Sequence, residues 1–253
     1  MGPVHGAFSK ITRVLLGADL GNLDDYEGWL KRGVRWKRGV RSEVSKETVF
    51  VPKLAFFDLA KRGFVRMKES YALGEQPSPV KSLEKLSLGN AGSLLKGILY
   101  FTPEAVVGES VGVEDMCTYF SSQYSIRGVY SNQSKLTAYC YWPRNSEYAF
   151  GCSMLFSSRF CIHCYNSENL TRCFELSDSH SCTGCYFCHN CENVHDSMFC
   201  FNTKNKRYAV GNVEVGRERY ARLKGMMLRE ISSRLLEKHS LEASILTLPC
   251  QGN

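Results

Sequence analysis

Small residues recur at every third position between residues 129 and 212. When the sequence is written in blocks of twelve from Val129, columns three, six, nine and twelve hold cysteine, serine, alanine, threonine, proline or an aliphatic residue. The exceptions, Lys206 and Asn212, both fall in the last block. An α-helix repeats its environment about every 3.6 residues and a strand about every 2, so neither explains a period of three. A position that accepts these residues and excludes charge is narrow and enclosed.

The period of twelve predicts a tight β-solenoid over about residues 129–212. Each twelve-residue coil turns inward four times and stacks about 4.8 Å from the next coil. Column five holds only asparagine, glutamine or serine, which we expect at sharp corners in the left-handed region of the backbone.

Cysteines occupy many of the inward columns and predict a structural cysteine stack inside the solenoid. The ten cysteines that share the inward phase are Cys140, Cys152, Cys161, Cys164, Cys173, Cys182, Cys185, Cys188, Cys191 and Cys200. Five of them fall in column twelve and should form one wall that points inward.

The outward column ten is apolar in every block. It reads Ala138, Phe150, Ile162, Phe174, Tyr186, Met198 and Val210. Stacking places these residues in a stripe roughly 30 Å long, too large an apolar surface for an uncovered monomer. We expect this column-ten stripe to be covered by the N-terminal helices or by another subunit, which makes Phe150, Ile162, Phe174, Tyr186 and Met198 candidate interface residues. In the alternative, column ten turns partly inward at a corner and enlarges the core.

Helical patterns flank the solenoid, so the predicted fold class is α+β. Residues 1–116 contain no cysteine and should form a mainly helical N-terminal region. Residues 117–212 form the cysteine-rich solenoid part, and residues 213–253 form a capping helix and a C-terminal tail. The helix is predicted over 216–240, where Tyr220, Leu223, Met227, Ile231 and Leu235 recur at helical spacing. Such a helix could cover the terminal coil, which would otherwise be an unpaired sheet edge.

The coil geometry is similar to the disulfide-braced β-helix of beetle antifreeze proteins, although the flat Thr-x-Thr face of those proteins is missing. The segments "YNSENLTRCFE", "CYFCHNCENV" and "TKNKRYAVGN", the last followed by a charged helix, more closely resemble the cysteine-rich repeat (NSxxCxxC-type) proteins of tailed phages and of uncultivated bacteria and archaea. This resemblance covers about residues 129–230. It implies a solenoid, suggests a virion or another large assembly as the setting, and supplies no catalytic residues.

The cysteines could also bind zinc or form disulfides. Cys161-x2-Cys164 and Cys182-x2-Cys185 lie seventeen residues apart, as in a zinc ribbon. The period of twelve accounts for all ten cysteines, whereas a zinc site accounts for four. Within the stack, cysteines on opposing walls, such as Cys182 with Cys188 or Cys185 with Cys191, could form disulfides. Reduced thiols that pack as small apolar groups are equally consistent with the sequence.

Composition and charge set wide limits. Hydrophobic residues make up 43% of the chain and charged residues 23%, as in ordinary globular proteins. No run approaches about eighteen apolar residues, so we expect no membrane-spanning helix. The N-terminal segment lacks a basic region followed by a long apolar stretch, so we expect no secretory signal and a cytoplasmic or virion location. The net charge of +7 permits an anionic partner without requiring one.

The segment "KRGVRWKRGVR" (31–41) is a direct repeat with six basic residues and no acidic one. Basic side chains next to an aromatic ring can neutralise phosphates and stack on a base. The candidate contacts to an anion or a nucleic acid are therefore Lys31, Arg32, Arg35, Trp36, Lys37, Arg38 and Arg41. Alternatively, the segment is a solvated basic loop or meets an acidic protein neighbour.

No motif of catalysis appears in the chain. A nucleophile elbow, a phosphate loop and an HExxH motif are all missing, and His163, His180, His189 and His195 fall in outward columns. We therefore predict a non-enzymatic structural or interaction protein: a rigid solenoid without a cofactor that binds protein partners, copies of itself included, within a larger assembly. The alternative is a zinc-containing nucleic-acid-binding module that uses residues 31–41.

Overall fold

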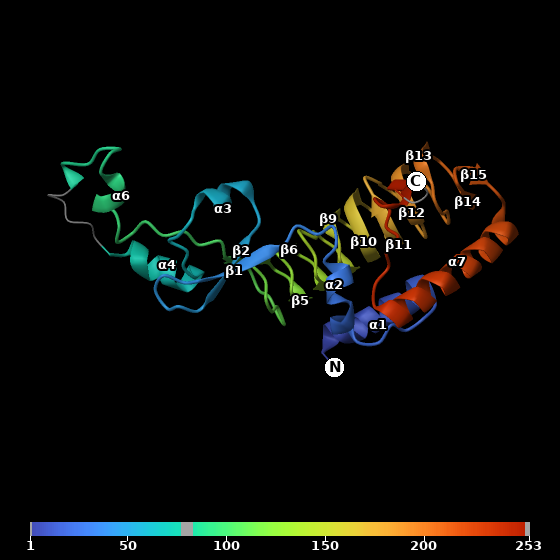
Figure 1. The fold of residues 1–253 in the computed structure, drawn as a ribbon, viewed down its shortest axis with the longest axis horizontal. Coiled ribbons are helices and arrows are strands. Elements are labelled where there is room, and N and C mark those ends of the chain that lie inside the picture. The colour runs from blue at the N-terminus through green and yellow to red at the C-terminus, as the bar shows by residue number, and fades with distance from the viewer. Residues whose placement is uncertain (1, 77–82, 251–253) are drawn as a thin grey trace.

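A computed structural model describes residues 2–76 and 83–250. The molecule is elongated, with a β-solenoid in its middle and an arm of short elements that projects from one end (Figure 1). Helices α1 (Pro3–Leu16) and α7 (Arg217–Lys238) lie along one side of the solenoid (Figure 1). The N-terminal helix, the solenoid and the C-terminal helix confirm the predicted α+β fold class. Among the residues that the structure describes, no helix has the length and apolar character needed to cross a membrane.

The solenoid consists of about eight coils with the predicted spacing of twelve residues. Successive strands pair in parallel with that shift, for example Cys161 with Cys173 and Ile162 with Phe174. The strands are β3 (Ala105–Val107), β4 (Thr118–Phe120), β5 (Gln123–Ile126), β6 (Tyr130–Asn132), β7 (Lys135–Ala138), β8 (Glu147–Phe150), β9 (Ser153–Phe156), β10 (Arg159–Glu168), β11 (Thr171–Ser177), β12 (Tyr186–Glu192) and β13 (Phe201–Lys204). A short antiparallel pair, β14 (Ala209–Val210) and β15 (Val213–Glu214), ends the solenoid.

The stacking begins earlier in the chain than predicted. Strand β3 pairs with β4, and isolated bridges join Val111 to Gln123 and Glu114 to Ile126. The first coil therefore starts near residue 105, inside the region that the sequence predicts to be mainly helical. The inward columns here carry Ser110 and Ser122 in place of cysteine, so the residue type that reveals the repeat is missing.

Every corner of a complete coil is made by one residue in the left-handed region of the backbone. In one coil these residues are Gln133, Leu136, Tyr139 and Trp142, with φ between 46° and 59°. The same four columns (two, five, eight and eleven) have positive φ in the following coils, and each stands directly before an inward residue. The prediction for column five is confirmed. The other three columns contain aromatic, aliphatic and charged residues, for which this conformation costs roughly 1–2 kcal/mol each.

The inward residues form a separate core inside the solenoid. All ten cysteines of the stack are buried there, together with Leu155, Leu170, Leu176 and Val194. Every member of this core falls in column three, six, nine or twelve.

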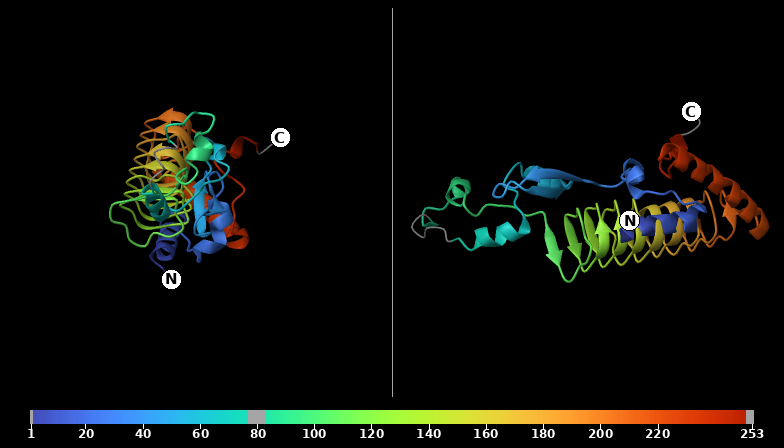
Figure 2. Two further views of the ribbon diagram at one scale, coloured as in Figure 1. Left: turned by 90° about the vertical axis from the view of Figure 1, so that its left-hand side faces the viewer. Right: turned by 90° about the horizontal axis from the view of Figure 1, so that it is seen from below.

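A second core joins the outside of the solenoid to the terminal segments. Helix α1, the 3-10 helix η1 (Leu23–Tyr26), helix α2 (Glu27–Leu30) and α7 contribute apolar side chains to it. Helix α7 starts at the last coil and then runs along the side toward α1 (Figure 2). Near its start, the Tyr220 hydroxyl donates to the carbonyl of Gly184, two coils before the last, at 3.3 Å. There the Ser232 hydroxyl donates to the Leu16 carbonyl at 3.1 Å. The tail after α7 folds back against the solenoid and ends in η2 (Leu248–Cys250).

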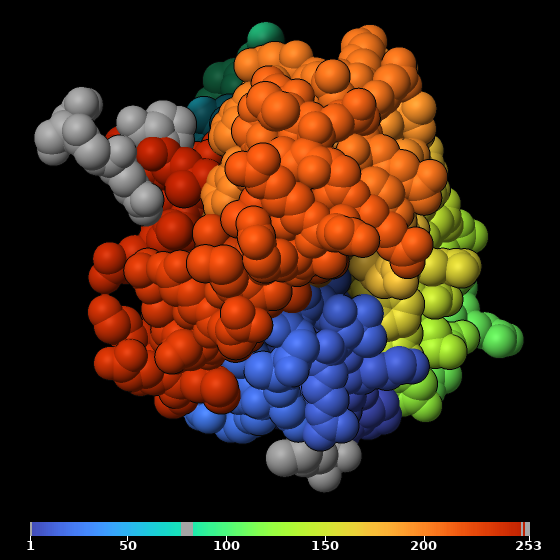
Figure 3. All heavy atoms as spheres, turned by 90° about the vertical axis from the view of Figure 1, so that its right-hand side faces the viewer, coloured from blue at the N-terminus to red at the C-terminus, as the bar shows by residue number. Residues whose placement is uncertain are grey.

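Side chains close the edge of the last coil, which faces the viewer in Figure 3. Between inner coils, a backbone N–H pairs with the carbonyl eleven residues later, as in His189 to Cys200 at 2.9 Å. At the last coil, the Phe201 N–H donates to Oδ1 of Asn212, and Nδ2 of Asn212 donates to the Phe201 carbonyl, both at 2.9 Å. The Asn212 side chain thus takes the place of a peptide group of one further coil.

The arm contains residues from the hairpin to the first coil. Strands β1 (Lys37–Arg41) and β2 (Thr48–Pro52) form an antiparallel hairpin, which the prediction of a mainly helical region did not include. Helices α3 (Ala55–Leu59), α4 (Met67–Gly74) and α6 (Ala91–Leu94) follow, and none of the three has a buried residue. The arm extends beyond the first coil at the left of Figure 1.

Removing the Asn212 side chain should destabilise the last coil. Because Asn212 has a φ of 66°, the Asn212→Gly variant removes both hydrogen bonds without backbone strain. We expect the free energy of unfolding in denaturant to fall by about 1–2 kcal/mol. Asn212→Asp keeps only the acceptor for the Phe201 N–H and should lose an intermediate amount. Equal stability of all three proteins would contradict the role assigned to this side chain.

Candidate functional site

The cysteine stack consists of free thiols. None of the cysteines that the structure describes is in a disulfide, and the opposing pairs Cys182 with Cys188 and Cys185 with Cys191 are unbonded. Each inward thiol lies against backbone carbonyls; Cys140 Sγ, for example, is 3.3 Å from the carbonyls of both Ala138 and Ala149.

The pKa values of neighbouring thiols in the stack shift in opposite directions. Burial raises the pKa of Cys140 and Cys164 well above the ordinary value of a thiol. Hydrogen bonds from neighbouring thiols lower the pKa of Cys200 to about 7 and, although burial opposes them, also lower the pKa of Cys152. Within residues 2–76 and 83–250, no three His, Cys, Asp or Glu side chains are arranged to share a metal ion. The zinc-ribbon pairs Cys161 with Cys164 and Cys182 with Cys185 belong to the buried stack instead. The stack is thus a packing feature whose thiols find hydrogen-bond acceptors on the surrounding backbone.

The basic segment 31–41 is held by contacts within the chain. Three of its side chains lie over aromatic rings: Lys31 over Trp36 at 4.5 Å, Arg35 over Tyr141 at 5.4 Å and Lys37 over Phe50 at 3.8 Å.

Lys31 and Lys37 also form polar contacts, as do Arg32, Arg38 and Arg41. Lys31 pairs with Glu27 at 2.8 Å, and Arg38 pairs with Asp58 at 3.4 Å. Arg32 donates to the Leu241 carbonyl at 2.7 Å, Lys37 to the Asp115 carbonyl and Arg41 to the Lys46 carbonyl at 3.2 Å. These contacts fix the path of the chain between the solenoid and the arm.

The column-ten stripe is covered by the chain's own helices. From Phe150 to Met198 it is buried in the core shared with α1, α2 and α7. The Phe8 and Phe150 rings lie 5.3 Å apart, and the Tyr186 hydroxyl donates to the Leu15 carbonyl at 2.8 Å. Of the two covers that the sequence left open, the N-terminal helices or another subunit, the structure shows the chain's own helices. The stripe is therefore an interface within one chain, and any contact with another subunit must use a different surface.

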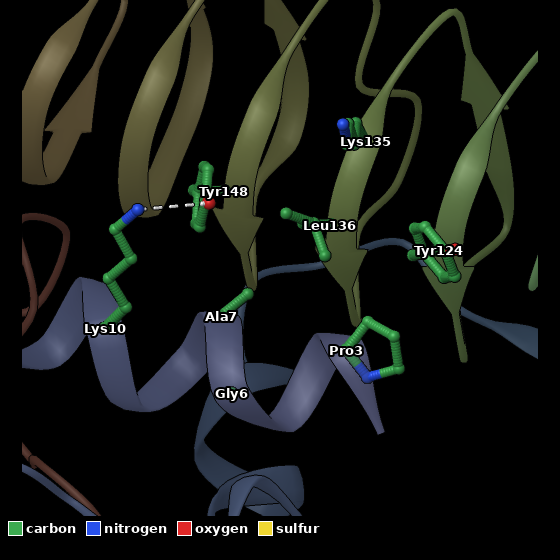
Figure 4. A pocket seen from close by; sticks show the side chains of 8 residues that line it. All are labelled: Pro3, Gly6, Ala7, Lys10, Tyr124, Lys135, Leu136 and Tyr148. Carbon is green, nitrogen blue, oxygen red and sulfur yellow. Dashed lines mark hydrogen bonds between the residues drawn. The ribbon is translucent and has the colours of Figure 1, made fainter. Parts of the chain in front are cut away.

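A shallow groove of about 380 Å³ remains beside α1 (Figure 4). Pro3, Gly6 and Ala7 of the helix face Tyr124, Leu136 and Tyr148 of the coils, and Lys10 donates to the Tyr148 hydroxyl at 3.4 Å. The groove is open to solvent, and none of the buried polar atoms that lack a partner belongs to its lining.

The structure also brings together a buried polar cluster, formed by His163, Tyr165 and Glu175, which the sequence analysis missed. His163 is 1% exposed and Glu175 is fully buried, although both stand in outward columns. They are covered by the segment around Trp29 and by the C-terminal tail, whose Ile245 N–H donates to Glu175 at 2.9 Å. A sequence signal does exist, because His163 and Glu175 interrupt a column eleven whose other members are aromatic or glycine.

Hydrogen bonds in the cluster select one neutral form of His163. The Tyr165 hydroxyl lies 2.6 Å from Nδ1 of His163 and donates to the Arg32 carbonyl at 3.3 Å. A hydroxyl that donates to Arg32 can accept only from a protonated Nδ1. Nε2 of His163 is then an acceptor, and among the described residues neither it nor Oε1 of Glu175 has a hydrogen-bond partner.

Burial keeps both titratable members uncharged. Nδ1 of His163 and Oε1 of Glu175 are 3.5 Å apart, which would suit an ion pair. However, desolvation raises the pKa of Glu175 to about 8 and lowers the pKa of His163 to about 3. An unpaired ion inside the protein would lose its hydration without compensation, so the neutral carboxyl and the neutral imidazole are favoured.

A cavity of about 170 Å³ lies over this cluster. Its walls come from Trp29, Arg32 and Gly33, from the three cluster residues, and from Leu241, Ser244, Leu246 and Thr247 of the tail. The buried side chains of His163 and Glu175 thus line a cavity that is partly open to solvent. The chain as a whole matches none of the protein-family models, curated proteins or solved structures with which it was compared.

The buried pair predicts a maximum of stability in mildly acidic solution. Glu175 holds its proton more tightly in the folded chain, with a pKa of about 8 against 4.5, so the free energy of unfolding should fall as pH rises between these values. His163 holds its proton less tightly, with a pKa of about 3 against 6.5, so stability should fall as pH drops between these values. The two effects oppose each other between pH 4.5 and pH 6.5.

Denaturant unfolding of the wild type and of Glu175→Gln separates this effect from other titrations. Between about pH 6.5 and pH 8 the wild type should lose about 2 kcal/mol relative to the variant. The exposed Glu168→Gln variant serves as the matched control and should follow the wild type. Parallel pH profiles of the wild type and Glu175→Gln would show that Glu175 is not buried as a neutral acid.

Proposed function

We propose that this protein is a structural element whose rigid solenoid holds an apolar arm that joins it to a second copy of the chain in a larger assembly. The solenoid supports a structural role, because its parallel coils carry their own core and are braced by two helices. The resemblance to phage-encoded repeat proteins suggests a virion as the setting of that assembly.

The distribution of exposed apolar side chains carries this proposal. Most of the large apolar side chains that solvent reaches lie in the arm and the first coil. They are Val44, Phe56, Leu59, Tyr71, Leu83, Leu86, Leu88, Ile98, Leu99, Phe101, Val106, Val107 and Val111. Leu59 is 83% exposed and Leu88 is 102% exposed. Apolar surface concentrated in one region is typical of a protein interface.

The two ends of the solenoid differ in a way that supports a contact at the arm. Asn212 occupies the hydrogen-bonding positions at the C-terminal edge. At the other end, β3 pairs with β4, and no other strand that the structure describes pairs with it. The Val106 N–H donates to Sδ of Met67 at 3.4 Å, but the side chains of Val106 and Val107 at this strand edge are exposed and can pack against another chain.

The charge of the arm fits a protein partner. Residues 53–116 contain eight basic and eight acidic side chains, and the hairpin residues 37–52 add four basic and two acidic ones. A surface with so little net charge gains little from phosphates, whereas apolar side chains gain from burial against protein. A twofold contact between two arms would bury the same apolar patch on both copies. The short helices of the arm, which have no buried residues, would then acquire a core.

The alternative function, a zinc-containing nucleic-acid-binding module, has weaker support. Apart from Arg32, the basic side chains of residues 31–41 already contact carbonyls, carboxylates or aromatic rings of their own chain. The cysteines proposed as zinc ligands lie in the buried stack.

The arm should control the oligomeric state. We expect the wild-type protein to sediment as a dimer at micromolar concentration, and the Leu59→Ser/Leu88→Ser double variant to dissociate at least about tenfold more readily. Both side chains are exposed, so the thermal midpoint of the solenoid should not change. The control variant Val213→Ser/Leu236→Ser removes exposed apolar side chains outside the arm and should behave as the wild type. A monomeric wild type, or a dimer that both double variants weaken equally, would contradict the proposal.

A further inference from the structure

We propose that the cavity over the His163 cluster binds a small organic carboxylate, whose charged group lies at Arg32 and whose hydrocarbon part lies against Trp29 and the tail. A cavity of about 170 Å³ has room for a molecule of a few non-hydrogen atoms. It lies on the side of the solenoid, between the Trp29 segment and the tail, so this inference does not depend on the role of the arm.

Arg32 provides the positive charge. Its guanidinium donates to the Leu241 carbonyl at 2.7 Å and to the Glu242 carbonyl at 3.5 Å. In the part of the chain that the structure describes, Arg32 forms no ion pair with an acidic side chain. A guanidinium has five N–H donors in a planar fork that matches a carboxylate, so donors remain for a ligand. Arg32 is also exposed, which places it at the entrance of the cavity.

The cavity contains the Glu175 carboxyl, which would repel an anionic ligand only if it were ionised. Glu175 is buried and its Oε1 has no partner in the chain. Around this carboxyl lie His163 and Tyr165 of neighbouring coils, Arg32 of the N-terminal segment and the Ile245 N–H of the tail. Cys152, from the interior, also contributes to its electrostatic environment.

A protonated Glu175 donates a hydrogen bond and carries no charge. Burial raises the pKa of Glu175 to about 8, so the neutral acid predominates at neutral pH. A buried neutral carboxyl can stabilise a nearby anionic oxygen by donating its O–H. Ionisation of Glu175 would place a second negative charge beside the ligand and weaken binding. The affinity should therefore fall as pH rises through about 8.

The walls favour a ligand with a hydrocarbon part. Trp29 is one of the residues that line the cavity, and its ring lies 4.6 Å from the His163 ring at an angle of 32°. Leu241 is buried, and Leu246 is 61% exposed at the outer rim. An aliphatic chain that displaces water from these surfaces adds affinity in proportion to the apolar area that it buries.

Titration of the intact protein with three probes tests the proposal. By calorimetry or ligand-observed NMR at about pH 7, butyrate should bind saturably with a dissociation constant on the order of 1 mM. Acetate should bind several-fold more weakly because it lacks the chain. Butyramide, which has the shape of butyrate without its charge, should bind at least about tenfold more weakly. Equal binding of butyrate and butyramide, or no saturation by butyrate at roughly 50 mM, would overturn the proposal.

Two variants test the assigned residues. Arg32→Gln keeps a donor for the tail carbonyls and should weaken butyrate binding about tenfold, whereas Arg35→Gln on the same segment should have no effect. Glu175→Gln keeps a hydrogen-bond donor that does not ionise, so it should bind butyrate at neutral pH and lose the decrease that the wild type shows above pH 8. Unchanged affinity in a folded Arg32→Gln protein would overturn the proposal. If that variant does not fold, the comparison of butyrate with butyramide on the wild type decides.

Discussion

The structure depends on a corner at every third residue. Each corner places one residue in the left-handed region and turns the next one inward, so four side chains from every coil meet in a narrow interior. The backbone cost of these corners must be offset by parallel hydrogen bonds between coils and by dense interior packing. Cysteine suits this interior because it is small and apolar and because its thiol lies against the carbonyls that the tight turns leave nearby.

The same corners also determine which outward surfaces of the solenoid other segments of the chain must cover. Columns that point outward form continuous stripes, and an apolar stripe such as that from Phe150 to Met198 requires a cover. Helices α1 and α7 provide it, and the Trp29 segment and the C-terminal tail enclose His163 and Glu175 beside it. The arm has no comparable support, since its helices bury none of their own residues. A rigid body with one end closed by Asn212 and the other end apolar and open is suited to an assembly.

Residue spacing predicted the features that follow from local sequence. The three-residue period shared by the ten cysteines from Cys140 to Cys200 was sufficient to predict the solenoid. Asparagine in column five predicted left-handed corners. The spacing did not predict left-handed Tyr148 or Phe160, because coil stacking overrides their intrinsic preference. Nor did it predict the burial of His163, since the covering segments around Trp29 and Ile245 lie far away in sequence. Tertiary contacts of this kind leave no periodic pattern near the residue that they bury.

The central claim is that reduced thiols, free of metal and of disulfides, fill the interior of the solenoid. A thiol titration without reductant, combined with metal analysis of the same sample, tests it most directly. Of the twelve cysteines, Cys250 is the exposed one and the others are buried. The native protein should therefore react with about one equivalent of thiol reagent and the denatured protein with about twelve, with no stoichiometric metal. Fewer thiols after denaturation, or one bound zinc ion per chain, would contradict this account.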